Sequence, residues 1–264
     1  MSKKSISELF NLSGQTAVVT GGAMGIGYGI VKRLHEAGAN VVIADLAEKE
    51  GQQKIEQLGG RALFVKTDVS SEADVKKLIS ATVEKFGGLD IFVNNAGIYP
   101  SASALTMDVQ LWDKVQAVNM RSVFLCCREA AGVMVKKGKG NIINIASIDA
   151  LHPSQIGLAA YDASKHGVWG FTKNFALELG NQGVRINAVA PGGIATEGVA
   201  KMSEPAAAAS IDMKEMTKQF LAKIPLGRMG EPDEIGTVVL FLASDASSYM
   251  TGSMIVVDGG ALLA

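Results

Sequence analysis

The chain has 264 residues, which suits one α/β domain or two small ones and is long enough for a sizeable hydrophobic core. Hydrophobic residues make up 48% of it and charged residues 19%, and the formal net charge of −1 gives no electrostatic reason to expect nucleic acid or an anionic membrane as a partner. No apolar run approaches the roughly 18 residues that a membrane-spanning helix needs.

Strand-like and helix-like segments alternate along the chain. Short runs rich in valine and isoleucine predict about seven strands, and most runs are continuous, as in parallel strands buried on both faces. The predicted strands are Ala17–Thr20, Val41–Ala44, Ala62–Lys66, Ile91–Asn94, Asn141–Ala146, Arg185–Ala190 and Met254–Val257. The predicted helices are Gly25–Ala37, Ala47–Leu58, Glu72–Phe86, Val109–Lys136, Tyr161–Leu179 and Asp233–Ala243.

This alternation predicts an α/β fold, a Rossmann-type doubly wound parallel sheet with helices on both faces. No repeat, linker or change of composition divides the chain, so residues 1–264 are predicted to form a single domain. Residues Thr196–Lys223 interrupt the alternation and contain Met202, Met213 and Met216. They suit a mobile cover over a substrate, and a plain surface insertion is the alternative.

Five glycines lie within nine residues of the segment VVTGGAMGIGYGI, directly after the first predicted strand. Their pattern is T-G-x-x-x-G-x-G, which differs from the G-x-G-x-x-G of the common dinucleotide fingerprint, and no Walker lysine follows. Gly21 would allow a tight turn, Gly25 a close approach of phosphate, and Gly27 close packing of helix on strand. A helix N-terminus favours phosphate, so we predict a dinucleotide site, with a merely glycine-rich turn as the alternative.

The second predicted strand ends at Asp45, eighteen residues after Gly27. A carboxylate there can accept hydrogen bonds from the adenosine ribose hydroxyls, and it would repel a 2′-phosphate. Leu46 follows where an arginine could hold that phosphate, and Met24 stands where a basic clamp could lie. The sequence therefore predicts NAD rather than NADP, with a helix N-cap as the alternative role of Asp45.

Ser147, Tyr161 and Lys165 carry the chemistry of the chain. Ser147 ends the predicted strand in NIINIAS, and YDASK opens the next helix with Tyr161 and Lys165 on one face, at i and i+4. A doubly wound sheet brings strand ends and helix starts to one edge, so the side chains can converge beside a nicotinamide. Taken alone, the Tyr-x-x-x-Lys spacing is a weak pattern, because such pairs are common on exposed helices.

The lysine is expected to make the tyrosine a base. A tyrosine phenol has a pKa of about 10, too high for a base at neutral pH. An ammonium group within about 4–6 Å stabilises phenolate, so Lys165 would lower the pKa of Tyr161. Tyr161 would then remove a proton from an alcohol or return it to a ketone. The Ser147 hydroxyl would hydrogen-bond the substrate oxygen and hold it nearby.

In these features the chain resembles the short-chain dehydrogenase/reductase family, in its compact single-domain branch. The resemblance covers nearly the whole chain, about Leu12 to Gly260, and the family's motifs occur in order. They are TGGAMGIG at Thr20–Gly27, DV at Asp68–Val69, NNAG at Asn94–Gly97, Asn119, Ser147, YDASK at Tyr161–Lys165 and PGGIAT at Pro191–Thr196. One departure lies in the glycine turn, where Ala23 and Met24 replace the polar residues frequent in the family.

The resemblance implies a dinucleotide-binding oxidoreductase domain with a proton relay. Asp68 and the Val69 amide would hydrogen-bond adenine, Asn94 would tie neighbouring strands together, and Asn119, in a kinked helix, would hold a water that links Lys165 to bulk solvent. A helix-bending amide without catalytic duty is the alternative for Asn119. The implied cofactor-binding residues are Gly21, Met24, Gly25, Ile26, Gly27, Asp45, Asp68, Val69, Asn95, Ala96, Gly97, Tyr161, Lys165, Pro191, Gly192, Ile194 and Thr196.

The loop between Ser147 and Tyr161 is predicted to wall the substrate pocket, together with Tyr99 and the methionine-bearing segment. Its polar residues suit a polyol or a sugar acid, whereas the methionines suit an apolar substrate, so the substrate class stays open. The histidines are too scattered for a metal site, and we predict none. The candidate substrate-binding residues are Ser147, Asp149, His152, Gln155 and Tyr161.

These features predict an NAD-dependent enzyme that interconverts a secondary alcohol and its ketone. Tyr161 would be the acid and base, Ser147 would orient the substrate, Lys165 would tune Tyr161 and hold the nicotinamide ribose, and Asn119 would support the relay. The alternatives are a 3-oxoacyl thioester reductase that uses NADPH and a dinucleotide-binding sensor or scaffold without catalysis.

The remaining predictions concern compartment and assembly. The segment MSKKSISELF reaches Glu8 before an apolar stretch forms, so we expect no secretory signal. Cys126 and Cys127 are adjacent and are interpreted as buried thiols, so we expect a cytoplasmic protein. The family resemblance implies a homotetramer. Its interfaces would be formed by the helices Val109–Lys136 and Tyr161–Leu179 and by the strand near Met254–Asp258.

Overall fold

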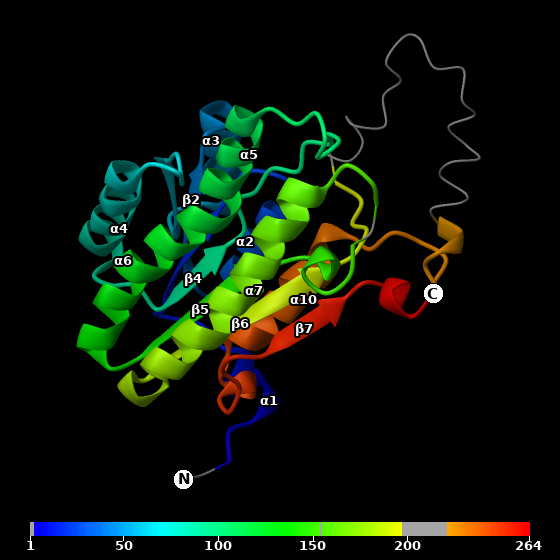
Figure 1. The fold of residues 1–264 in the computed structure, drawn as a ribbon. Coiled ribbons are helices and arrows are strands. Elements are labelled where there is room, and N and C mark those ends of the chain that lie inside the picture. The colour runs from blue at the N-terminus through cyan, green and yellow to red at the C-terminus, as the bar shows by residue number, and fades with distance from the viewer. Residues whose placement is uncertain (1–2, 154, 197–220) are drawn as a thin grey trace.

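The structure is a computed structural model, and it describes residues 3–153, 155–196 and 221–264. Its seven strands form one parallel sheet in the order β3-β2-β1-β4-β5-β6-β7 (Figure 1). The predicted doubly wound sheet is confirmed, and each predicted strand is present with ends within one residue of those expected. The strands are β1 (Thr16–Thr20), β2 (Asn40–Asp45), β3 (Ala62–Lys66), β4 (Ile91–Asn94), β5 (Gly140–Ile145), β6 (Val184–Pro191) and β7 (Met254–Val257).

The chain builds this sheet outward from β1 in both directions. β2 and β3 follow on one side, and β4 returns past β1 to begin the other side. β1 pairs in parallel with both β2 and β4, so the strand order reverses at the carboxyl ends of β1 and β4, where Gly21 and Asn95 follow. Open α/β sheets bind ligands at such a switch point.

Helices cover both faces of the sheet. The helix predicted at Val109–Lys136 is interrupted by a π-helical turn, Ala117–Arg121, and α7 begins at Ala159 rather than at Tyr161. Within the described ranges, no helix has the length and hydrophobicity needed to cross a membrane. The helices are α1 (Ile6–Phe10), α2 (Gly25–Glu36), α3 (Glu48–Leu58), α4 (Glu72–Phe86), α5 (Val109–Gln116), α6 (Ser122–Lys137), α7 (Ala159–Leu179) and α10 (Pro232–Ala243).

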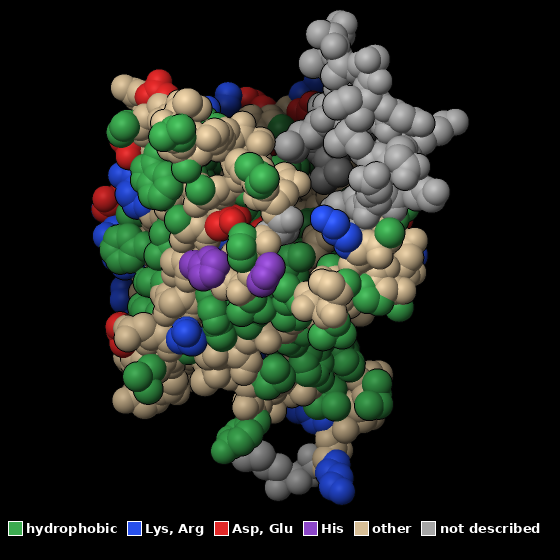
Figure 2. Space-filling model, turned by 45° about the vertical axis from the view of Figure 1, so that its right-hand side comes forward, with side chains coloured by type: hydrophobic (Ala, Val, Ile, Leu, Met, Phe, Trp, Pro, Cys, Tyr) green, Lys and Arg blue, Asp and Glu red, His purple; other side chains and the backbone are tan. Residues whose placement is uncertain are grey.

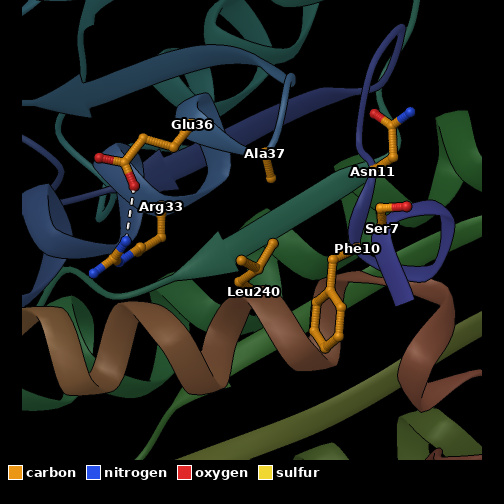
Figure 3. A pocket seen from close by; sticks show the side chains of 7 residues that line it. All are labelled: Ser7, Phe10, Asn11, Arg33, Glu36, Ala37 and Leu240. Atoms are coloured by element: carbon orange, nitrogen blue, oxygen red, sulfur yellow. Dashed lines mark hydrogen bonds and ion pairs between the residues drawn. The ribbon is translucent and has the colours of Figure 1, made fainter. Parts of the chain in front are cut away.

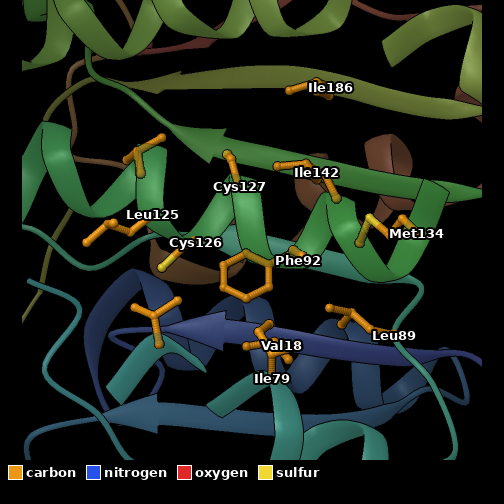
Figure 4. Packing of buried hydrophobic residues seen from close by; sticks show 14 of the residues in the cluster. Val18, Ile79, Leu89, Phe92, Leu125, Cys126, Cys127, Met134, Ile142 and Ile186 are labelled. Carbon is orange, nitrogen blue, oxygen red and sulfur yellow. The ribbon is translucent and has the colours of Figure 1, made fainter. Parts of the chain in front are cut away.

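Successive strand residues divide the hydrophobic core between the two faces. Val18 and Phe92 pack with side chains of α4, α6 and α7 (Figure 4). Their neighbours Val19 and Val93 pack with side chains of α2 and α10 on the other face. All four are fully buried, and burying a side chain of this kind contributes about 1.5–3 kcal/mol. Burial on both faces explains why these strands read as continuous apolar runs.

Cys126 and Cys127 lie in the core beside α7, and both are free thiols, as predicted. Burial raises the pKa of the Cys126 thiol to about 12 and also raises that of Cys127. The Asn94 amide donates to Cys127 Sγ at 3.3 Å and to Asn144 Oδ1 at 2.8 Å. Asn94 and Asn144 are register partners, so the predicted amide bridge between neighbouring strands is present.

A pocket lies between α1, α2 and α10 (Figure 3). α1 was not predicted, and it begins with a capping box in which the Ser5 hydroxyl accepts from the Glu8 amide and the Glu8 carboxylate accepts from the Ser5 amide. The carboxyl end of α2 lines this pocket. The pocket therefore lies at the amino ends of the strands, away from the switch point. It is lined by Ser7, Phe10, Asn11, Arg33, Glu36, Ala37 and Leu240.

Candidate active site

Steric contacts shape the glycine turn after β1. Gly21 and Gly25 have positive φ angles of 62° and 52°, which residues with a side chain rarely adopt. A Cβ at Gly27 would lie 1.9 Å from the Gly21 carbonyl oxygen, so only glycine lets α2 approach the turn this closely. The predicted tight turn at Gly21 and close packing at Gly27 are therefore present.

α2 presents an N-terminus without a side-chain cap. Its N-cap residue, Met24, makes no side-chain hydrogen bond to the first turn, which begins at Gly25 and Ile26. Uncapped amides at a helix N-terminus bind anions. Thr196 lies close to this turn, because a Cβ at Gly25 would be 3.4 Å from Thr196 Cγ2. The glycine turn and the segment after β6 are therefore close enough to contact one ligand together.

Asp45 braces this turn from the end of β2. Its Oδ2 accepts from the Ala23 amide and its Oδ1 from the Ala47 amide, both at 3.0 Å. The alternative role of Asp45 as a helix N-cap is wrong, because the N-cap of α3 is Ala47, two residues later. A carboxylate oxygen can accept more than one hydrogen bond, so the half-buried Asp45 can also accept from a ribose.

A second brace joins the ends of β1 and β4. The Thr20 hydroxyl accepts from the Asn95 and Ala96 amides at 3.0 and 3.1 Å. The Asn95 side chain donates to the carbonyl oxygens of Thr20 and Gly21 at 2.9 and 3.1 Å. The Asn95 side chain is therefore engaged with the glycine turn. A bound dinucleotide would contact the backbone of Asn95 and Ala96 rather than the Asn95 side-chain amide.

The other residues predicted around the dinucleotide follow β3 and β6 at the same edge. Asp68 Oδ1 accepts from the Ser70 amide at 2.9 Å and the Ser70 hydroxyl at 2.6 Å, and Val69 is buried. After Pro191 ends β6, the Gly192 amide donates to the Val257 carbonyl at 2.9 Å.

Ile194, further along this segment, is also buried and forms a bridge to Gly230. The segment Thr196–Lys223, predicted to cover the substrate, lies outside the described residues over 197–220. Pro191 to Thr196 thus pass beside the glycine turn before the described part of the chain is interrupted.

Asn119 occupies the π-helical turn between α5 and α6. Its side chain pairs with the backbone of Ile98 in both directions, with both hydrogen bonds at 2.8 Å, and also donates to the Ser164 hydroxyl at 3.1 Å. A Cβ at Gly97 would lie 3.4 Å from Asn119 Oδ1 and 3.8 Å from Lys165 Nζ. The predicted kinked helix is present, and it brings this amide next to Lys165.

Lys165 is almost completely buried, with 4% of its surface exposed. Its Nζ donates to the Ile145 carbonyl at 2.8 Å and lies 5.5 Å from the centre of the Tyr161 ring. Burial lowers the pKa of Lys165 to about 8, although the Asp149 carboxylate raises it. The carbonyl at the end of β5 therefore fixes the ammonium group beside Tyr161.

Tyr161 contacts Ser147 through its phenol. Burial raises the pKa of Tyr161 well above its ordinary value, and the hydrogen bond with Ser147 lowers it by less. The predicted lowering of the Tyr161 pKa is therefore wrong for the protein without a bound cofactor. The reason is that the same burial that disfavours the phenolate also disfavours the charge on Lys165.

The predicted substrate contacts separate into a buried and an exposed group. Asp149 is buried and accepts the Ser147 hydroxyl at 2.9 Å. The Tyr99 ring meets the Tyr161 ring edge-on, with centres 6.1 Å apart. His152 and Gln155 are exposed on the loop. No group of three or more potential metal ligands occurs in the part of the chain that the structure describes.

Sequence comparison places this site in a known family. A family model described as enoyl-(acyl carrier protein) reductase matches residues 21–261. The short chain dehydrogenase/reductase astE of Aspergillus oryzae is 42% identical over 258 residues, which cover 95% of this chain and 96% of that relative. The chain belongs to the short-chain dehydrogenase/reductase family. Its members also include the 3-oxoacyl-[acyl-carrier-protein] reductase FabG of Chlamydia pneumoniae, 40% identical over 252 residues, 94% of this chain and 97% of that protein.

Solved structures of similar proteins share the fold. A short-chain type dehydrogenase/reductase from Mycobacterium marinum superimposes with a TM-score of 0.88 at 36% identity, over 97% of this chain and 99% of that chain. Levodione reductase superimposes with a TM-score of 0.90 at 32% identity, over 96% of this chain and 100% of that chain. This short-chain dehydrogenase/reductase is therefore an oxidoreductase of the Rossmann-type fold.

Three groups that support the site of this short-chain dehydrogenase/reductase were not among the predicted site residues. They are the Ile145 carbonyl under Lys165, the Thr20 hydroxyl under Asn95 and Ala96, and the Ser164 hydroxyl beside Asn119. A backbone carbonyl has no sequence signal. Thr20 and Ser164 lie inside the recognised motifs, and their position directly before the glycine turn and before Lys165 could have marked them.

Replacing Lys165 by methionine should remove a pH dependence of stability. The folded-state pKa of about 8 lies below the ordinary 10.5, so between these values the unfolded chain binds more protons and stability rises with pH. Below that range, the buried charge costs roughly 3 kcal/mol. Urea unfolding should therefore show the wild type gaining free energy of unfolding, relative to Lys165→Met, between about pH 8 and 10.

The matched control is Lys173→Met, which removes a lysine that stands over the Trp169 ring on the same helix. Its free energy of unfolding should follow the wild-type pH dependence. If Lys165→Met did the same, Lys165 would not be held in a buried, charge-disfavouring place.

Proposed function

We propose that the chain is an NAD-dependent oxidoreductase that interconverts a secondary alcohol and its ketone. The observation that carries the proposal is the grouping of Ser147, Tyr161 and Lys165 at the edge of the sheet where the glycine turn also lies. Ser147 and Lys165 are buried, with 6% and 4% of their surface exposed. Burying such groups is costly, and a sensor that only bound a dinucleotide would need none of them.

The residues around the glycine turn fit a dinucleotide cofactor. The uncapped amides at the start of α2 suit the pyrophosphate, and the Asp45 carboxylate suits the ribose hydroxyls. Leu46 beside it is exposed and offers no positive charge to a 2′-phosphate. When bound, NAD⁺ supplies the hydride acceptor and a positive charge beside the substrate.

The chain's own groups handle the proton. In alcohol oxidation, the substrate hydroxyl proton moves to the Tyr161 oxygen, and in ketone reduction Tyr161 returns it. Ser147 donates to the substrate oxygen and holds it within reach of Tyr161. Lys165, fixed by the Ile145 carbonyl, stabilises the phenolate and can donate to the ribose. Asn119, which like Lys165 lies close to Gly97, would support a relay from Lys165 to solvent.

A second candidate is reduction of a 3-oxoacyl thioester with NADPH. The 40% identity to the reductase FabG of Chlamydia pneumoniae favours it. Asp45 argues against it, because its carboxylate stands at the end of β2 where a 2′-phosphate would have to bind. Both candidates use the same proton-transferring group, so the choice between them concerns the cofactor and the substrate.

A substrate screen with NAD⁺ and NADP⁺ side by side tests the proposal. A panel of secondary alcohols should form NADH faster than NADPH, as followed by absorbance of the reduced nicotinamide. Consumption of NADPH with acetoacetyl thioester, and none of the alcohols oxidised with NAD⁺, would instead establish the second candidate.

Asp45→Asn should shift the cofactor preference toward NADP. The substitution removes the negative charge while an amide oxygen can still accept from the Ala47 backbone. Removing like-charge repulsion should lower the ratio of kcat/KM for NAD⁺ over NADP⁺ by about tenfold or more. The exposed carboxylate of Glu48 pairs with Lys66, so Glu48→Gln serves as the control and should keep the wild-type ratio. An unchanged ratio in Asp45→Asn would reject the ribose role.

We also propose that the protein assembles as a homotetramer in the cytoplasm. Large apolar side chains are exposed on the helices that the resemblance places between subunits, among them Val109 and Trp112 on α5 and Phe124 on α6. Figure 2 shows hydrophobic side chains gathered over the middle and lower part of the face that it presents. Light scattering measures the assembly, and a monomer at micromolar concentration would contradict it.

A further inference from the structure

Asp149 is a buried carboxylate for which the proposed reaction has no use. It lies on the short 3-10 turn Ile148–Ala150 directly after Ser147, and 6% of its surface is exposed. Its Oδ2 accepts the Ser147 hydroxyl at 2.9 Å, and its amide donates to Ser147 Oγ at 3.1 Å. The hydroxyl proton that should hold a substrate oxygen is therefore directed at a carboxylate in the free chain.

The charge of Asp149 acts on the whole catalytic group. Burial is the main cause of the pKa shifts of Tyr161, Asp162 and Lys165. The Asp149 carboxylate is a further cause, and it raises the pKa of all three. A carboxylate in this place opposes formation of the Tyr161 phenolate. In the turnover of an alcohol with a single hydroxyl, Asp149 only disfavours the Tyr161 phenolate. This disadvantage points to a substrate that forms a hydrogen bond with the Asp149 carboxylate.

We propose that Asp149 selects substrates with a second hydroxyl on the carbon next to the reacting one, that is, vicinal diols and α-hydroxyketones. This inference rests on the proposed function, since it names the substrate class of the same site. The reacting oxygen accepts from Ser147, and the neighbouring hydroxyl donates to Asp149.

The geometry of the Ser147–Asp149 pair suits such a substrate. The oxygens of a vicinal diol in its gauche form are separated by about one hydrogen-bond length. Ser147 Oγ and Asp149 Oδ2 are likewise 2.9 Å apart, so the two substrate oxygens can lie alongside this pair. Each protein group then exchanges its mutual hydrogen bond for one to the substrate.

A substrate with a single hydroxyl makes a poorer exchange. When it takes the Ser147 donor, Asp149 loses that hydrogen bond in a buried place and gains none from the substrate. Losing a donor from a buried charged acceptor corresponds to about a 10- to 100-fold lower affinity for the bound state. A neutral hydroxyl suits the place better than an ammonium group, because Lys165 already places a cation beside Tyr161.

Matched pairs of substrates test this selection. The pairs are 2-butanol with 2,3-butanediol, cyclohexanol with 1,2-cyclohexanediol, and 2-butanone with acetoin. In the two oxidations the hydride of the reacting carbon passes to NAD⁺ and the hydroxyl proton leaves through Tyr161, so NADH formation counts turnovers. In the reduction of 2-butanone and acetoin, NADH supplies the hydride and Tyr161 supplies the proton, so NADH consumption counts turnovers. We expect the wild-type kcat/KM to be about 10- to 100-fold higher for the hydroxylated member of each pair.

Asp149→Ala should collapse this ratio toward unity. Asp149→Asn, which keeps the shape of the side chain, should give an intermediate ratio and serves as the test where the alanine variant does not fold. The control is Asp162→Asn, which removes a neighbouring carboxylate that is not hydrogen-bonded to Ser147. Its ratio should equal that of the wild type.

The outcomes separate this inference from the proposed function. If wild-type enzyme turns over both members of each pair equally well, or if Asp149→Ala slows both equally, the selection by Asp149 is wrong and the proposed function stands. If no pair is turned over while NADH still binds, the proposed function fails and this inference fails with it.

Discussion

Tyr161→Phe should lower turnover of a secondary alcohol by about 100- to 10,000-fold while NADH binding stays close to that of the wild type. The phenol oxygen is the group proposed to move the substrate proton, and its loss leaves no other phenol in hydrogen-bond contact with Ser147 among the described residues. Phenylalanine keeps the ring that packs edge-on against Tyr99. NADH formation measures turnover, and the change of NADH fluorescence on binding measures affinity.

Two controls tie the loss of turnover to the phenol oxygen of Tyr161. Tyr249 is fully exposed, so Tyr249→Phe removes a phenol elsewhere and should leave turnover unchanged. Tyr161→Phe should remain folded at the assay temperature, as thermal unfolding would show, since losing the hydrogen bond with Ser147 costs only about 1 kcal/mol. Near-normal turnover in Tyr161→Phe would overturn the role of Tyr161 and with it the proposed proton path.

Gly27→Ala should be the most damaging small substitution in the glycine turn. Its Cβ would lie 1.9 Å from the Gly21 carbonyl oxygen and 2.6 Å from Asn95 Nδ2, and the backbone oxygen cannot move aside without displacing the turn. We expect a loss of about 3 kcal/mol or more in the free energy of unfolding. Urea unfolding measures this loss, and NADH fluorescence should show that cofactor binding is lost as well.

Gly132→Ala is the matched control for this substitution. Gly132 is exposed within α6, and a Cβ there would meet no atom within 4 Å. An alanine in a helix interior should stabilise the protein by about 0.5–1 kcal/mol. Equal stability of Gly27→Ala and the wild type would mean that α2 does not pack on the turn as described.

The strands were the easiest part of the fold to predict, and the smallest helices were the hardest. Parallel strands buried on both faces need apolar residues at every position, so each strand appears as a run such as Ala17–Thr20. α1 escaped prediction because it has five residues, and local capping by Ser5 and Glu8 holds it. The family resemblance indicated a kinked helix at Asn119, and the structure adds that the π-helical turn Ala117–Arg121 holds Asn119 in contact with Ile98.

The candidate site divides in the same way. The motif positions indicated which side chains would gather, and Ser147, Tyr161 and Lys165 do lie together. Their electrostatics followed from packing. The pKa of Tyr161 is raised rather than lowered because burial outweighs the hydrogen bond with Ser147, and no spacing rule reports burial.

The amino-acid sequence by itself determined the order of strands and helices, the glycine turn and which residues are candidates for the acid–base group, because these depend on residue type and local spacing. Only the tertiary structure decided which backbone and side-chain groups contact those residues. It placed the Ile145 carbonyl under Lys165 and the Asp149 carboxylate on the Ser147 hydroxyl. Such contacts depend on which elements pack together and how much water they exclude, and these conditions arise only when the whole sheet and its helices have assembled.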